Sequence, residues 1–152
     1  MKALLAAGGL VLLSALPAMA ANMQLCRPGQ TDAAPKPLPP SLINAARRGF
    51  GYTQMPAAVV TTMTVFRCAA GQPMMCSVGA NLPCGKADKA TSLPGVTQYC
   101  AANPQAAFVP AYITGHDTRY QWHCAAGQAV PTSPAPLDAQ GYFAEYWKAS
   151  SP

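Results

Sequence analysis

The chain has 152 residues, of which 51% are hydrophobic and only 10% are charged, and it holds 16 prolines and six cysteines. One domain is expected at this length. Much of the hydrophobic fraction is alanine or lies in an apolar N-terminal segment, so few large aliphatic side chains are left for a core. This composition excludes a transmembrane helix bundle, a coiled coil and a large multidomain enzyme, while the aromatic residues argue against a disordered chain.

Residues 1–20 have the pattern of a signal peptide. Lys2 supplies the positive charge, residues 4–16 form an apolar stretch, and Ala18-Met19-Ala20 is a typical cleavage signal. The apolar stretch is too short to cross a bilayer, and no later run is long enough. We therefore expect cleavage after Ala20, export from a bacterial cell to the periplasm or the medium, and no membrane span in the mature chain.

Prolines punctuate residues 21–40, which are expected to form a Pro-rich arm that Cys26 pins to the domain. Residues 41–48 predict a short helix. Ser41 suits its first turn, and Gly49 suits a left-handed stop.

The rest of the chain reads as alternating strands and turns with one more helix. The turn signals lie at 69–72, 114–117 and 125–127, and a loop is expected over 79–90. Strands are predicted at 59–68, 74–78, 108–113, 118–124 and 142–147, and a helix at 92–103 with Ser92 as its cap.

These elements predict an α+β fold spanning residues 41–149 as a single domain. Its expected architecture is a small antiparallel sheet of four to six strands with two short helices, stabilised by disulfides.

All six cysteines follow the signal segment, at Cys26, Cys68, Cys76, Cys84, Cys100 and Cys124. An even number of cysteines, export to an oxidising compartment and a thin core together favour three disulfides. No C-x2-C pair is present, which disfavours a zinc site.

One motif occurs twice. Cys68-Ala-Ala-Gly-Gln72 returns as Cys124-Ala-Ala-Gly-Gln128, and each copy follows an aromatic residue two positions earlier, Phe66 and Trp122. The repeat predicts two similar hairpins. If their strands lie side by side, Cys68 and Cys124 can form a disulfide.

The spacing also bears on the other cysteines. With a four-residue turn, Cys68 faces Pro73, which leaves Cys76 about three positions away, so we expect Cys68 and Cys76 not to pair. A local bond between Cys84 in the loop and Cys100 on the helix is the other favoured pairing.

Acid–base chemistry has few candidates, because the chain has only two histidines and five acidic residues. His116 and Asp117 are neighbours in a turn, where such residues seldom orient each other, and His123 falls on the polar face of its strand. We therefore expect an exported, non-enzymatic binding or interaction module with no catalytic residue, no metal site and no cofactor. The alternative is a small hydrolase or a thiol-dependent enzyme that uses His116 or His123.

Loops are the expected contact surface, since loops carry most of the binding residues of small domains. The candidates are Asn81, Lys86, His116, Asp117 and His123. The net charge of +5 comes from scattered basic residues, whereas nucleic-acid-binding proteins concentrate theirs in a patch or stripe. The expected partner is an unknown protein or a component of the cell envelope, and not a nucleic acid.

A periplasmic copper binder is a second alternative, because thioethers suit Cu(I) and imidazoles also bind copper. Its candidate ligands are the two histidines with Met55, Met63, Met74 and Met75. Consecutive residues of a strand point to opposite faces, so Met74 and Met75 are not expected to serve one site.

Residues 65–86 (VFRCAAGQPMMCSVGANLPCGK) and 110–127 (PAYITGHDTRYQWHCAAG) carry a resemblance. They resemble segments of small, exported, cysteine-containing bacterial proteins to which no activity is assigned. The resemblance covers about residues 60–147 and is carried by the cysteine placement and the GANLPC and TGHDTRYQW runs. It implies export and disulfides, and it implies no catalytic or ligand-binding residue.

Overall fold

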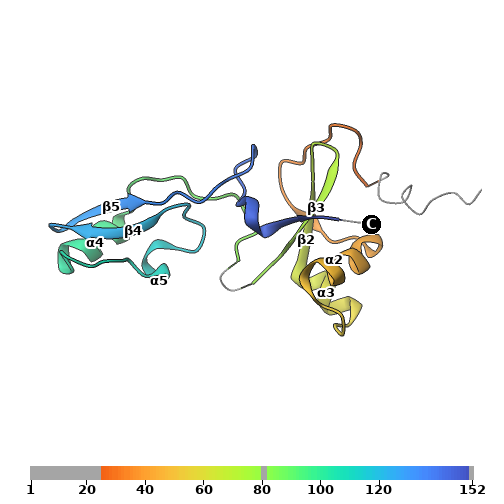
Figure 1. Cartoon of the computed structure of the whole chain (residues 1–152), viewed down its shortest axis with the longest axis horizontal. Helices are drawn as coiled ribbons and strands as arrows, with labels where there is room; N and C mark the ends of the chain where they lie inside the picture. The colour runs from red at the N-terminus through yellow and green to blue at the C-terminus, as the bar shows by residue number, and fades with distance from the viewer. Residues whose placement is uncertain (1–24, 80–81, 151–152) are drawn as a thin grey trace, which may run out of the picture.

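The computed structural model of the chain describes residues 25–79 and 82–150, so the expected signal peptide lies outside the described residues. Figure 1 shows two lobes. The sheet lobe is built on a four-stranded antiparallel sheet, and the hairpin lobe on a two-stranded antiparallel sheet. Helices accompany both sheets, which confirms the expected α+β class.

The sheet lobe joins segments from both ends of the described chain. Its strands lie in the order β1, β2, β3, β6, with bounds Lys36–Pro37, Thr64–Ala69, Gln72–Ser77 and Trp147–Ala149. β1 belongs to the expected Pro-rich arm, and Leu38 just beyond it is buried. This part of the arm is therefore packed onto the sheet.

Three helical segments precede β2. They are the 3₁₀ helix η1 (Pro40–Leu42), α2 (Ile43–Phe50) and α3 (Ala57–Met63). The helix predicted over 41–48 forms as η1 and α2 together.

The expected ends of this helix need correction. Ser41 lies inside η1 and makes no capping bond with its side chain, and Gly49 lies inside α2. The left-handed stop is Gly51, with a φ of +73°. Extending the helix to Phe50 places that ring against the core of the lobe.

The predicted strand at 59–68 is wrong over its first half, which belongs to α3. Pro56 precedes α3 as its N-cap, and the hydroxyls of Thr61 and Thr62 donate to carbonyls four residues earlier, at 3.0 and 2.9 Å. Val60 is fully buried against the core. Burial on a helix face therefore outweighs the strand preference of these branched residues.

The hairpin lobe contains α4 (Pro94–Ala102), α5 (Ala111–Thr114), β4 (Gln121–Ala125) and β5 (Gln128–Thr132). α4 confirms the helix predicted over 92–103. Its N-cap is Leu93 rather than Ser92, and no side chain caps it.

Two strand predictions beyond α4 fail. Residues 108–113 do not form a strand, because Pro110 cannot donate a hydrogen bond and the chain enters α5 directly after it. The segment 106–109 still runs beside β4, since the Val109 N–H donates to the Trp122 carbonyl at 2.8 Å. The strand predicted at 142–147 is largely irregular, with the 3₁₀ helix η2 (Ala144–Tyr146) before β6.

The two copies of the Cys-Ala-Ala-Gly-Gln motif form the same turn, as predicted. The φ values are +50° and +84° at Ala70 and Gly71, and +49° and +79° at Ala126 and Gly127. Two positive φ values in a two-residue loop are typical of a type I′ turn, which matches the twist of the flanking strands.

Small buried clusters fill the two lobes. One face of the sheet carries Cys26, Leu38, Leu42, Ala45, Ala46, Val60, Phe66, Cys68 and Met75, and the other carries Cys76, Cys84, Tyr142 and Trp147. The hairpin lobe has the cluster Val96, Cys100, Val109, Trp122 and Cys124. Each cluster includes one disulfide, so the bridges support the places where the apolar core is thin.

Three disulfides join Cys26 to Cys68, Cys76 to Cys84 and Cys100 to Cys124, and no cysteine is free. The first one pins the arm to β2, as expected. Such bridges are typical of proteins in an oxidising, extracellular environment.

The favoured pairings Cys84–Cys100 and Cys68–Cys124 are wrong. Cys84 packs against the sheet lobe, whereas Cys100 on α4 packs in the hairpin lobe. Cys68 and Cys124 lie in similar hairpins that belong to separate sheets. The register does place Cys68 opposite Pro73, so the expectation that Cys68 does not bond to its hairpin neighbour is confirmed.

Candidate functional site

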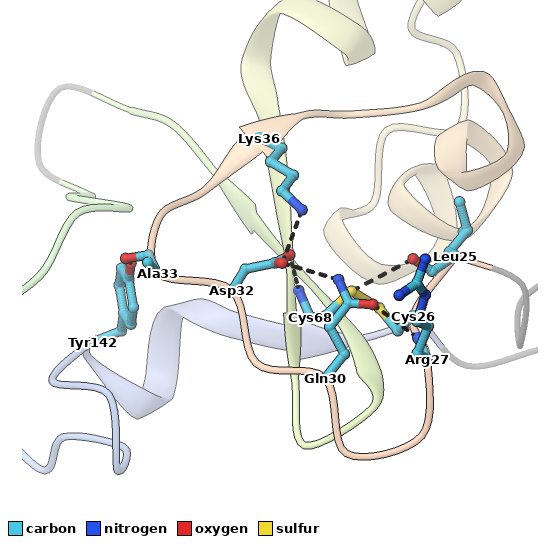
Figure 2. A network of polar contacts seen from close by, with 9 residues as sticks. All are labelled: Leu25, Cys26, Arg27, Gln30, Asp32, Ala33, Lys36, Cys68 and Tyr142. Atoms are coloured by element: carbon cyan, nitrogen blue, oxygen red, sulfur yellow. Dashed lines mark hydrogen bonds and ion pairs between the residues drawn. A yellow bond between two sulfur atoms is a disulfide. The ribbon is translucent and has the colours of Figure 1, made fainter.

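Asp32 is the centre of a buried polar network (Figure 2). Its carboxylate accepts hydrogen bonds from the Lys36 ammonium at 2.8 Å, the Gln30 amide at 3.0 Å and the Cys68 backbone N–H at 2.8 Å. Burial by itself raises the pKa of Asp32, but these hydrogen bonds lower it more, so that the pKa lies below its ordinary value of 3.8. The network joins the arm to β2 and supports the fold.

Arg67 is a second buried charge that supports the fold. It is fully buried on β2, and its guanidinium lies between two rings, with Cζ 4.2 Å from the centroid of Tyr142 and 4.4 Å from that of Trp147. Asp138 forms an ion pair with it. The Tyr142 hydroxyl donates to the Ala33 carbonyl at 3.1 Å, which ties the C-terminal segment to the arm (Figure 2).

An open groove of about 350 Å³ lies beside α5 in the hairpin lobe. Its lining comes from the segment before α5, from α5 and the turn after it, from β4 and from η2. The lining includes the aromatic or polar side chains of Phe108, His116, Tyr120, Gln121, His123 and Tyr146. A volume of this size falls within the range of small-ligand sites.

The turn after α5 positions His116. Gly115 ends α5 with a φ of +80°, and a Cβ there would stand 2.9 Å from the Asp117 Oδ1. Only glycine therefore fits this position without strain, and the tight turn brings His116 to the groove.

Two aromatic side chains beside α5 are unusually exposed. Phe108 is 68% exposed and Tyr112 is 80% exposed, the highest values among the large apolar side chains of the described residues. Tyr112 lines a second groove on α5, together with Gln98 and Tyr99 of α4. Phe108, in the segment before α5, thus lines the first groove, and Tyr112 on α5 lines the second.

Several polar side chains of these grooves make no hydrogen bond to another described residue. Among the described residues, no hydrogen bond engages the imidazoles of His116 and His123 or the side-chain amides of Gln98 and Gln121. Burial and the nearby Glu145 carboxylate raise the pKa of Tyr146 above its ordinary value of 10.0, so its hydroxyl stays protonated. The imidazoles and the amides are therefore available to a ligand, whereas the Tyr146 hydroxyl interacts with Glu145.

Neither groove is lined by Asp, Glu, Lys or Arg. Asp32 and Asp138 pair with basic side chains, and the Asp88 carboxylate accepts a hydrogen bond from the Ala90 N–H at 2.8 Å. The remaining acids, at positions 117 and 145, are exposed. The groove histidines therefore lack a carboxylate in the lining to orient them, and the disulfides leave no thiol for a thiol-dependent enzyme.

The structure brings together two of the five residues predicted for the contact surface. His116 and His123 line the same groove, whereas Asp117 and Lys86 do not. Lys86 lies against the sheet lobe, with its ammonium 5.9 Å from the ring centroid of Tyr142, and Asn81 lies outside the described residues.

Three of the four methionines considered as copper ligands, Met55, Met74 and Met75, pack in or against the cores of the sheet lobe. Met75 is fully buried on one face of the sheet, and Met74 packs on the opposite face, as the alternation of strand residues predicts. Both histidines lie in the other lobe. Among the described residues, no group of three or more His, Cys, Asp or Glu side chains could hold a metal ion.

Phe108 and Tyr112 are the site residues that sequence reasoning missed. Both fell within the strand predicted at 108–113, where one face is expected to be buried. The signal available in the sequence is Pro110 between them, which disfavours continued strand pairing.

Comparison with known proteins adds no relative: no family model, curated protein or solved structure matches the chain. In residues 25–79 and 82–150, no helix has the length and apolar character needed to cross a membrane.

Proposed function

We propose that the protein is an exported, disulfide-stabilised binding module of the cell envelope that carries out no catalysis. The observation that supports this most is the composition of the groove beside α5, which offers aromatic rings and polar side chains but no carboxylate. Hydrolysis needs a base and a group that orients it. Binding needs a hollow of suitable size with a few well-placed polar groups, which the groove provides.

The proposed compartment is the bacterial periplasm or the medium. The signal-peptide pattern of residues 1–20 and the three disulfides both support it. The proposed partner is an envelope component or another exported protein. A nucleic acid is not proposed, because the groove has no Lys or Arg in its lining.

Binding to isolated envelope material tests this proposal. Purified protein is incubated with peptidoglycan sacculi, outer-membrane fragments and inner-membrane vesicles, and the pelleted fraction is measured for the wild type and for Phe108→Ala. We expect the wild type to pellet with one of these fractions and the variant to bind roughly tenfold more weakly or worse, because truncating a central aromatic side chain commonly removes that much affinity.

Val59→Ala is the matched control, since Val59 is a large apolar residue that is 40% exposed in the other lobe. Circular dichroism establishes that each variant is folded. Equal pelleting of all three proteins, or pelleting of none of them, would contradict the proposal.

A small hydrolase is the second candidate, because both histidines line one groove. It predicts turnover of ester, peptide or glycosidic substrates that drops in both His116→Gln and His123→Gln while the fold is retained. That outcome would contradict the proposed binding function and support an enzymatic one. We expect no such turnover, because the lining supplies no carboxylate partner for either imidazole.

A further inference from the structure

The geometry points to an uncharged glycan as the ligand of the two grooves beside α5, with sugar rings stacked on Phe108 and Tyr112. This inference rests on the proposed function, since it names the ligand class of the same surface. It is carried by exposed aromatic rings, by polar side chains without a partner among the described residues, and by the absence of Asp, Glu, Lys and Arg from the lining of both grooves.

Two aromatic rings beside α5 are suited to stack on sugar rings. Phe108 and Tyr112 expose most of their surface to water, which is unfavourable unless another molecule covers them. The face of an aromatic ring is electron-rich, and the C–H groups of a pyranose ring pack well against it. The two residues are four positions apart, so the chain between them spans at most about 14 Å, a distance that a short oligosaccharide can cover.

Polar side chains of both grooves can form hydrogen bonds with sugar hydroxyls. The imidazoles of His116 and His123 and the amides of Gln98 and Gln121 can each donate or accept a hydrogen bond. No described side chain or backbone group uses them. The hydroxyl groups of a sugar are donors and acceptors at once, and they match such a mixed set of polar partners.

The lining of both grooves favours an uncharged sugar over an anionic one. The chain carries a net charge of +5, yet neither groove has Lys or Arg in its lining. A phosphate or a uronic acid would therefore find no counter-charge there, and desolvating it would be unfavourable. Neutral sugars incur no such penalty.

An extended peptide is disfavoured because the strand edges of this lobe are occupied or blocked. The outer edge of β4 already bonds to the segment 106–109. On β5, Pro131 lies opposite Trp122 and has no N–H to offer at the free edge. A peptide cannot add a regular strand there, so recognition depends on side chains.

Titration with neutral tetrasaccharides tests the inference. The probes are the tetramer of N-acetylglucosamine, cellotetraose and maltotetraose, added to ¹⁵N-labelled, fully oxidised protein and followed by NMR. We expect at least one sugar to bind and to shift the signals of residues 108–123 while those of β2 and β3 stay in place. The affinity should fall about tenfold or more in Phe108→Ala and in Tyr112→Ala, and it should be unchanged in Val59→Ala.

Salt and a peptide probe separate the alternatives. Between about 0.01 M and about 1 M salt the sugar affinity is expected to stay constant, because no ion pair forms. A strongly salt-dependent affinity would overturn the uncharged ligand. If no sugar binds but an uncharged Pro-rich peptide binds at residues 108–123, the proposal of a glycan ligand is overturned, whereas the proposal of a binding module stands. Failure of every sugar together with failure of envelope binding would remove both proposals.

Discussion

Loss of the Cys100–Cys124 disulfide is expected to unfold the hairpin lobe before the sheet lobe. The bridge links α4 to β4 across a sequence separation of 24 residues, and loop-closure entropy for that separation corresponds to about 3.4 kcal/mol of stabilisation. The lobe has little to offset the loss, because the rest of its buried cluster is Val96, Val109 and Trp122. In Cys100→Ala/Cys124→Ala the free energy of unfolding of this lobe should fall by about 3.4 kcal/mol.

The two tryptophans allow each lobe to be followed separately. Trp122 is buried in the hairpin lobe and Trp147 in the sheet lobe, so labelling with 5-fluorotryptophan gives one ¹⁹F NMR resonance for each. In a denaturant titration of the variant, the resonance of Trp122 should move to its unfolded position at a lower denaturant concentration than that of Trp147.

Cys76→Ala/Cys84→Ala is the matched control. Its bridge has a sequence separation of only 8, which corresponds to about 2.5 kcal/mol, and it lies in the cluster that contains Trp147. In this control, the unfolding midpoint reported by Trp147 should therefore shift by less than the midpoint reported by Trp122 shifts in Cys100→Ala/Cys124→Ala. A hairpin-lobe midpoint that does not change when its own disulfide is removed would refute the reasoning.

Three further predictions concern the buried charges and the repeated turn. Asp138→Asn removes the ion-pair partner of Arg67 and should lower the free energy of unfolding by about 2 to 3 kcal/mol in urea titrations, below the full cost of an unpaired buried charge because Asp138 is partly exposed. The depressed pKa of Asp32 means that its stabilising effect is complete above the ordinary value of 3.8 and is lost as the pH falls below it, so Asp32→Asn should flatten the acid side of a stability–pH profile. Gly71→Ala should lower the melting temperature more than Gly127→Ala, although both residues have a similar positive φ, because a Cβ at position 71 would stand 2.9 Å from a backbone nitrogen, whereas the nearest heavy atoms to a Cβ at position 127 would be 3.9 Å away.

Sequence reasoning predicted the local features that depend on a few neighbouring residues. The two hairpin turns follow from the positive φ that glycine allows in each Cys-Ala-Ala-Gly-Gln motif. The helix at α4 follows from Pro94 at its first turn, and the thin core with several cysteines predicted the disulfides.

Features that depend on distant contacts were not predictable in the same way. Val60 lies in a helix because that helix buries it against the sheet, and branched side chains alone favour a strand. The disulfide pairing depends on which elements share a lobe. Spacing placed Cys84 near Cys100, but the chain crosses from one lobe to the other between them.

The candidate site was predictable only in part. His116 and His123 stand out in the sequence because the chain has no other histidine, and the structure places both in one groove. The aromatic rings of Phe108 and Tyr112 are exposed because Pro110 diverts the chain into α5, and this exposure decides what the groove can hold.

The order of the three disulfides has a consequence for how the protein matures. The six cysteines pair in their order along the chain, first with second, third with fourth and fifth with sixth, and no bridge encloses or crosses another. For a chain exported as proposed, a thiol oxidase that acts on cysteines in their order of emergence produces the native set directly. Maturation then requires an oxidant during translocation, and no shuffling of mispaired bridges afterwards.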